Sequence, residues 1–128
     1  MFTKPRSRGF RFSEAFDLMF KFLSSAPEKA FAGELAARLE KDVPPGQMLA
    51  NMKSMSVNKI TRMLERTYQS VANYQREHRL GMFKRAALAN AFKWELKSRG
   101  YPEEFVDLAT EGLVMELMKA AGPPAAKS

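Results

Sequence analysis

The chain has 128 residues, of which 45% are hydrophobic, 27% are charged and none is cysteine. This length and composition predict one globular domain and argue against a disordered chain. The lack of cysteine excludes disulfides, thiol nucleophiles and zinc–thiolate sites. A single histidine, His78, excludes a multi-histidine metal site.

No apolar run approaches the ~18 to 20 residues that a membrane-spanning helix needs. Residues 15–23 follow a basic start and so imitate a signal peptide, but Asp17 and Lys21 interrupt them. The residues after them, Ser24-Ser25-Ala26-Pro27, make a poor cleavage site. We therefore expect a cytoplasmic protein with no membrane contact.

Residues 1–12 are predicted to be a flexible basic arm, because they contain four cations and no acid and show no helical period. Arginines alternate with aromatic rings in this arm, at Arg6, Arg8, Phe10, Arg11 and Phe12. In a nucleic-acid binder, such guanidinium groups contact phosphates and such rings stack on bases. The rest of the chain is expected to form a single helical domain over residues 13–122 and a flexible tail over 123–128.

The first predicted helix begins at Ser13, a favourable N-cap residue. A second helix runs from the capping-box pair Ser25 and Glu28 to about Asp42, and prolines stop it there. The methionine-rich residues 48–55 fit either a helix or a loop. In the first helix, apolar side chains recur at i, i+3, i+4 and i+7, at Phe16, Met19, Phe20 and Leu23.

Three further helices are predicted, over residues 57–79, 82–99 and 102–122. Gly81 is suited to a left-handed end of the first of these, and Gly100 ends the second. The helix over residues 82–99 has two adjacent apolar rows, Phe83, Ala87, Ala91 and Trp94 beside Leu88, Phe92 and Leu96. Without any strand-like alternation, the fold class is all-α, a compact five-helix bundle.

Charge is distributed unevenly along the chain. Residues 57–100 hold ten basic and three acidic side chains, a net charge of +7, whereas residues 101–122 hold five acids and one lysine, a net charge of −4. Two arrangements follow from these counts. The acidic last helix either lies beside a basic one and neutralises it, or faces the opposite way and makes the molecule dipolar.

Six polar side chains recur at alternating steps of three and four residues along the helix over residues 57–79. They would share one face of a straight helix, a stripe about 26 Å long. Lysine and arginine contact phosphates, and asparagine, glutamine and arginine also contact base edges. The stripe is equally typical of an ordinary solvated helix face. Its members are Lys59, Arg62, Arg66, Gln69, Asn73 and Arg76.

Methionine is abundant, with nine in the chain, and three of them are spaced helically in the segment after the prolines. Flexible thioether side chains suit adaptable binding surfaces as well as irregular cores. Exposed methionines and aromatics would suit a protein–protein adaptor or a small subunit of a larger assembly. The candidate partner-binding residues are Met48, Met52, Met55, Phe10 and Phe12.

The sequence offers no catalytic constellation, and no cofactor or metal is expected. His78 is isolated near a helix end, and no serine lies in a nucleophile motif. The helix dipole favours acids at the start of the last helix, which explains them without a bound cation. We therefore expect a small non-enzymatic binding protein. DNA or RNA is the favoured partner, through the basic stripe and the arm, and an adaptor for another protein is the alternative.

Overall fold

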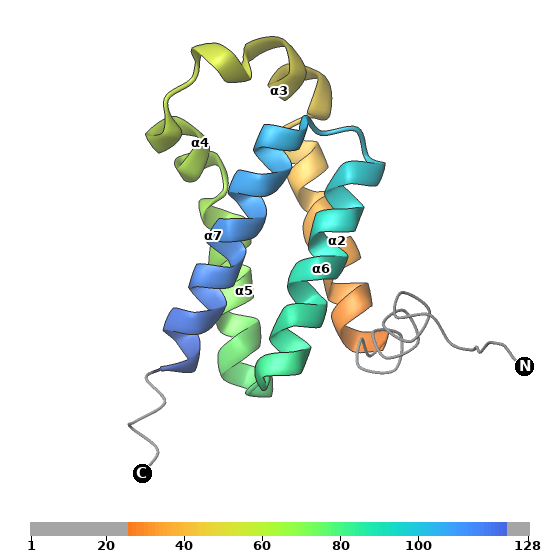
Figure 1. The fold of residues 1–128 in the computed structure, drawn as a ribbon, viewed down its shortest axis with the longest axis vertical. Helices are drawn as coiled ribbons and strands as arrows, with labels where there is room; N and C mark the ends of the chain where they lie inside the picture. The colour runs from red at the N-terminus through yellow and green to blue at the C-terminus, as the bar shows by residue number, and fades with distance from the viewer. Residues whose placement is uncertain (1–25, 123–128) are drawn as a thin grey trace, which may run out of the picture.

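A computed structural model describes residues 26–122, and every regular element in that range is helical. This confirms the all-α class. None of the helices between those limits combines the length and the apolar character needed to cross a bilayer. The elements, drawn in Figure 1, are α2 (Ala26–Asp42), α3 (Pro45–Asn51), the 3-10 helix η1 (Met52–Ser54), α4 (Val57–Met63), α5 (Glu65–His78), α6 (Met82–Ser98) and α7 (Glu103–Ala121).

The predicted count of five helices is close but not exact, since the described residues contain six α-helices. The segment over residues 57–79 is two helices rather than one, and part of the methionine-rich segment forms α3. The end of α2 at Asp42 is as predicted. The predicted arm, the helix from Ser13 and the tail lie outside the described residues.

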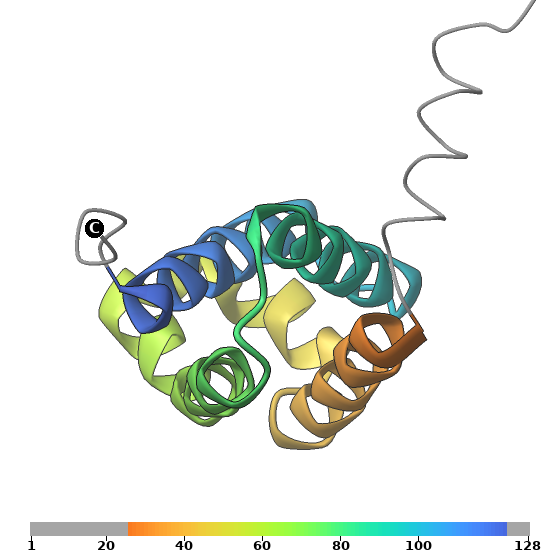
Figure 2. The same cartoon turned by 90° about the horizontal axis from the view of Figure 1, so that it is seen from below.

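The four long helices form two layers, with α6 and α7 in one and α2 and α5 in the other (Figure 2). Helices α2 and α6 run in the same direction, because ion pairs join them near both ends. Glu28 Oε1 lies 3.9 Å from Lys84 Nζ near the start of each helix, and Glu40 Oε1 lies 2.7 Å from Arg99 Nη1 near the end. Elements α3, η1 and α4 lie together at one end of these layers (Figure 1).

The core lies between the two layers. Of the two apolar rows predicted on α6, the second is the core row, since Leu88, Phe92 and Leu96 are fully buried. Phe83 and Trp94, the large members of the first row, remain 65% and 60% exposed. Ala87, between them in that row, is fully buried, so only the large side chains at the two ends of the row face solvent. The largest buried partners of the core row are Leu35, Leu39, Met48, Leu64, Phe105, Leu113 and Leu117.

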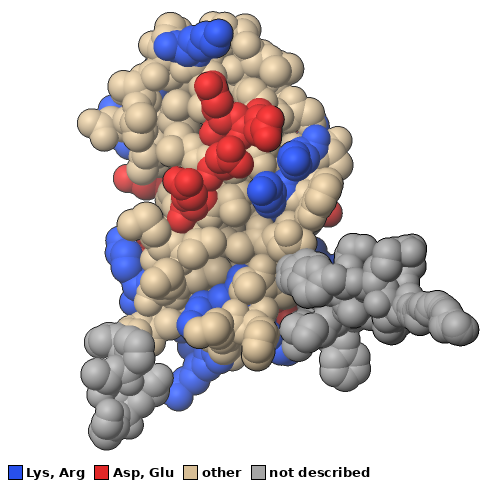
Figure 3. All heavy atoms as spheres, in the orientation of Figure 1, with Lys and Arg blue, Asp and Glu red and all other residues tan. Residues whose placement is uncertain are grey.

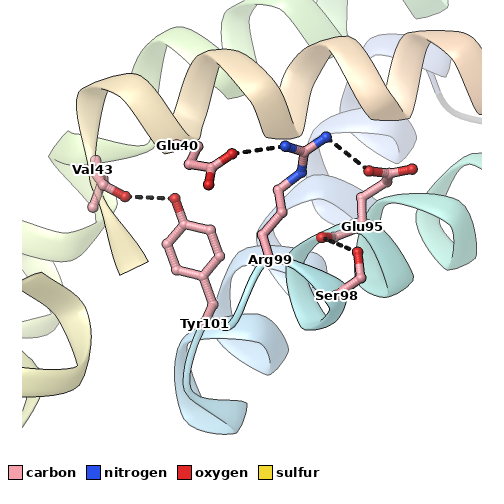
Figure 4. A network of polar contacts seen from close by, with 6 residues as sticks. All are labelled: Glu40, Val43, Glu95, Ser98, Arg99 and Tyr101. Carbon is pink, nitrogen blue, oxygen red and sulfur yellow. Dashed lines mark hydrogen bonds and ion pairs between the residues drawn. The ribbon is translucent and has the colours of Figure 1, made fainter. Parts of the chain in front are cut away.

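The end of α6 is fixed by backbone and side-chain bonds (Figure 4). Gly100 has a φ of 94°, and the amide of Tyr101 donates to Leu96 O, which closes a Schellman turn. Arg99 donates to Glu40 at 2.7 Å and to Glu95 at 3.0 Å. Tyr101 Oη donates to Val43 O at 2.5 Å. These contacts hold the end of α2 against the turn between α6 and α7, which makes the cluster structural.

The turn between α5 and α6 differs from the prediction for Gly81. This glycine has a φ of −78° and precedes α6, whereas the left-handed residue is Arg79, with a φ of 51°. The tight reversal is held at Leu80 O, which accepts from Gln75 Nε2 at 3.1 Å and from Arg85 Nη1 at 2.8 Å. Both bonds fix Leu80 in place. The chain reverses at the residue before it, the left-handed Arg79.

Replacing Arg79 by glycine is expected to stabilise the protein by about 0.5 kcal/mol. An L-residue in the left-handed region costs ~1 to 2 kcal/mol, and the greater entropy of glycine in the unfolded chain offsets part of the gain. Urea unfolding measures the change. Gly81→Ala is the control and should be close to neutral, since a Cβ there meets nothing within 4 Å. A lower stability for Arg79→Gly would contradict the left-handed conformation assigned to Arg79.

Candidate nucleic-acid interface

All six residues of the predicted stripe are exposed. They lie on two helices, with Lys59 and Arg62 on α4 and the other four on α5. We call these six the basic face: Lys59, Arg62, Arg66, Gln69, Asn73 and Arg76. Exposure is the first property that a phosphate-binding surface needs, and the sequence pattern predicted it correctly.

The basic face is not the straight stripe that the sequence predicted. Ser56 caps α4, its Oγ accepting from the Lys59 amide at 3.1 Å. The helix is interrupted at Leu64, whose amide donates to both Ile60 O at 3.2 Å and Thr61 O at 3.0 Å. This tightened turn separates α4, which lies across the end of the bundle, from α5, which runs along it (Figure 1). Ile60 and Leu64 are both buried as a result, and the basic face bends between Arg62 and Arg66.

The acids of the last helix do not neutralise the basic face. We call Glu103, Glu104, Asp107 and Glu111 the acidic patch; all four are exposed. Figure 3 shows acidic side chains gathered on the outward side of α7, whereas α5 belongs to the other layer (Figure 2). No ion pair among residues 26–122 joins this patch to the basic face. Helix α7 lies beside the basic helices α5 and α6, as in the first arrangement left open by the sequence, but its acidic patch forms no ion pair with the basic face.

Nearer acids moderate the charge of the basic face. Arg66 Nη1 lies 3.6 Å from Asp42 Oδ2 on α2, and Arg66 is 86% exposed at its side chain. An exposed pair of this kind contributes only about 0.2 to 1 kcal/mol, so it holds the guanidinium weakly. Glu65 and Glu77 are also exposed on α5. The face therefore carries a modest positive charge.

A polar hollow beside the basic face adds cations that sequence reasoning missed. It lies between α2 and α5, encloses about 170 Å³ and is lined by Arg38, Lys41, Asp42 and Arg66 among others. Arg38 and Lys41 are exposed on α2. Their spacing of three residues was visible in the sequence, but nothing in the sequence placed α2 beside α5. The hollow therefore brings three cations together around one carboxylate, that of Asp42.

The prediction of a partner surface at the methionine-rich segment is wrong for its first residue, Met48. Met48 is fully buried, and Met52 and Met55 are half-buried against the core. These side chains fill the space under α3 and η1, where a flexible thioether packs well against irregular backbone. Phe10, Phe12 and the arm arginines Arg6, Arg8 and Arg11 lie outside the described residues.

The described residues contain no group of three or more potential ligands that could hold a metal ion. His78 Nε2 lies 3.8 Å from Glu77 Oε1, and the His78 ring packs on Tyr74 with centroids 4.1 Å apart. Tyr74 in turn stacks on Phe31 and donates to Glu28 at 2.9 Å. These rings join α5 to α2.

The chain matches no family model, no curated protein and no solved structure. We therefore infer a function from the charge, exposure and shape of the described residues.

Proposed function

We propose that this protein binds nucleic acid through the basic face, extended by Arg38 and Lys41 at the polar hollow. The observation that supports the proposal most is that, among the described residues, no ion pair joins the basic face to the acidic patch. Four lysine and arginine side chains of the basic face are open to solvent, and the acidic patch lies on the opposite layer. The acidic patch therefore does not occupy these cations.

The residue types of the basic face fit two kinds of contact. Lysine and arginine neutralise phosphates, release condensed counterions and supply most of the affinity. Gln69 and Asn73 lie between the cations on α5, where their amides can hydrogen-bond to sugars or base edges. The bend between Arg62 and Arg66 spreads the cations around one end of the molecule. We expect Arg66 to exchange Asp42 for a phosphate, because the exposed pair is weak.

The alternative, an adaptor that docks through Met48, Met52, Met55, Phe10 and Phe12, has less support at its three methionines. A fully buried Met48 cannot contact a partner, and its two neighbours already pack against the core. Arg38, Lys41 and the basic face, in contrast, are exposed and can contact a partner without rearrangement. We therefore favour nucleic acid as the partner.

Binding to a fluorescent 20-nucleotide DNA strand, an RNA of the same sequence and the DNA duplex, followed by anisotropy, tests the proposal. About four phosphates contacted on a duplex predict a slope near −3.6 for the logarithm of affinity against that of salt concentration. Raising the salt from about 50 to about 200 mM should then weaken binding roughly 100-fold. No binding to any of the three probes at the lower salt would reject the proposal.

A double charge reversal locates the interface. Arg62→Glu with Arg76→Glu spares the pair between Arg66 and Asp42, and should weaken binding at least about tenfold and reduce the salt slope by about 2. The matched control, Lys97→Glu with Lys119→Glu, makes the same change of charge at exposed positions on α6 and α7. Circular dichroism confirms that both variants fold. Equal losses in both would mean that net charge alone drives binding, and would contradict the assignment.

A further inference from the structure

Helices α6 and α7 lie side by side and share an apolar groove of about 520 Å³ between them. Met82 and Met118 line this groove and are 72% and 60% exposed. A contiguous apolar patch of this kind on a small domain marks an interaction surface. We call the exposed apolar residues of the groove the apolar end; they are Met82, Ala86, Val114 and Met118.

The other end of the same surface is charged. A turn of only four residues, 99–102, joins the two helices, so they run in opposite directions and the end of α6 lies beside the start of α7. A second hollow of about 470 Å³ adjoins the groove there, lined by Lys93 of α6 and by Asp107 and Glu111 of α7. Its cation lies on α6 and its acids on α7, and Lys97 lies one turn further along the same side of α6. We call Lys93, Lys97 and the acidic patch the charged end.

The charged end has no ion-pair partner within residues 26–122. No ion pair of that range includes Lys93, Lys97 or a member of the acidic patch. Figure 3 shows the acids exposed over α7. An occupant that satisfies the whole surface is apolar beside the groove, acidic opposite α6 and basic opposite α7. A second copy of this chain has that pattern, since its own α7 is acidic and its own α6 basic at one end.

We propose that two copies of this protein form a symmetric dimer through this surface, with α6 of each copy opposite α7 of the other. The pattern selects the symmetry axis. A two-fold axis parallel to the two helices and midway between them exchanges α6 with α7 and keeps every residue at its own height. The apolar end then meets the apolar end of the other copy, and Lys93 meets the acidic patch of the other copy.

The other symmetric arrangement is unfavourable. A two-fold axis perpendicular to the helices would place α6 opposite α6 and would set the apolar end of each copy over the charged end of the other. The methionines would then desolvate Lys93 and the acidic patch without supplying a charged partner, which costs free energy. The first arrangement gives four helices packed together around the two grooves, where flexible methionine side chains can fill the space.

The size of the surface predicts the strength of the dimer. Helices α6 and α7 have 17 and 19 residues and are therefore about 26 and 29 Å long. Side by side they present about 500 Å² in projection, near the ~600 Å² per partner of the smallest standard interfaces. We therefore expect a dissociation constant in the micromolar range. The inference does not use the basic face, so dimer formation and nucleic-acid binding can fail separately.

Sedimentation velocity of the full chain, at protein concentrations from below to above the micromolar range, tests the proposal. Met82→Asp with Met118→Asp puts charges into the apolar end of both copies and should weaken the dimer at least about 100-fold. The matched control is Leu49→Asp with Val57→Asp, because these apolar side chains are also exposed but lie on α3 and α4. The control should leave the dissociation constant unchanged. Circular dichroism confirms that both variants fold.

Exchanging charges tests which helix lies opposite which. Lys93→Glu alone and Glu111→Lys alone should each weaken the dimer at least about fivefold, because symmetry repeats each new repulsion twice. An equal mixture of the two variants should associate about as well as the parent chain, because the new acid on α6 then meets the new base on α7 of the other copy. If α6 lay opposite α6, Lys93→Glu would not introduce a repulsion between the copies.

Each outcome decides the proposal. A parent chain that stays monomeric at every concentration would overturn it, as would equal weakening by the groove variant and its control. Single charge variants that dimerise like the parent, or a mixture of them that stays monomeric, would overturn the pairing of α6 with α7. Loss of dimer in each charge variant and recovery in their mixture would support the proposed axis.

Discussion

Gly112→Ala is expected to destabilise the protein by about 1 to 3 kcal/mol, although alanine favours helix over glycine by ~1 kcal/mol. A Cβ at Gly112 would lie 2.5 Å from Cζ of Tyr68 and closer still to its hydroxyl. The ring cannot easily move away, since Tyr68 is half-buried and its hydroxyl donates to Ala109 O at 3.2 Å. Helices α5 and α7 would have to separate. Urea unfolding measures the loss.

The clash can be separated from other effects by a double-mutant cycle. In a Tyr68→Ala background nothing opposes the new methyl group, so Gly112→Ala should become stabilising by roughly 0.5 to 1 kcal/mol. Gly46→Ala is a second control, because a Cβ there meets no atom within 4 Å. If Gly112→Ala stabilises the parent chain, the close contact of α5 with α7 is not as described.

Alkaline pH is expected to unfold the protein between pH 10 and 12. Burial raises the pKa of Tyr68, Tyr74 and Tyr101 from the ordinary value of 10.0 to about 12, helped at Tyr101 by the nearby Glu40 carboxylate. A raised pKa means that the folded state holds the proton more tightly than the unfolded state. The stability linked to it is complete below pH 10 and is lost as the pH rises toward 12.

Tyr101, which is 6% exposed, should account for about 2 kcal/mol of this loss at pH 12. Tyrosinate absorbance, measured beside helical circular dichroism, should show ionisation and unfolding in the same pH range. Tyr101→Phe lacks the ionisable group, so its stability should fall less steeply between pH 10 and 12. At neutral pH it loses about 1 kcal/mol, because Val43 O is left without its donor. A parent chain that ionises below pH 10 without unfolding would contradict the burial of these hydroxyls.

Local patterns in the sequence predicted most of the helices correctly. Asp42 ends α2 because prolines follow it, and Gly100 ends α6 because it supports a left-handed turn. Predictions that needed tertiary packing were less successful. The break at Leu64 was missed, because the apolar period runs through it unchanged. Phe83 and Trp94 fit a helical row as well as Leu88 does, but they remain exposed whereas Leu88 is fully buried.

In the candidate interface too, local properties were predicted from the sequence and tertiary packing was not. Exposure of Arg62 and Arg76 followed from the polar stripe of an amphipathic helix, a local property. The hollow with Arg38 and Lys41 depends on how α2 lies against α5, which periodicity does not specify. Met48 was wrongly assigned to a partner surface, because thioether side chains suit a binding surface and a core equally well. Only the position of α3 shows that Met48 belongs to the core.

The parallel pairing of α2 with α6 also bears on how the chain folds during synthesis. Glu40 and Arg99, which join the two helices, are 59 residues apart in sequence, and Val43 and Tyr101 are 58 apart. At typical ribosomal rates, roughly 3 to 12 seconds separate the appearance of the two partners. Throughout that interval the leucines of α2 have no α6 to cover them. The native contacts at this end of the bundle therefore form only after α6 and Tyr101 have been synthesised.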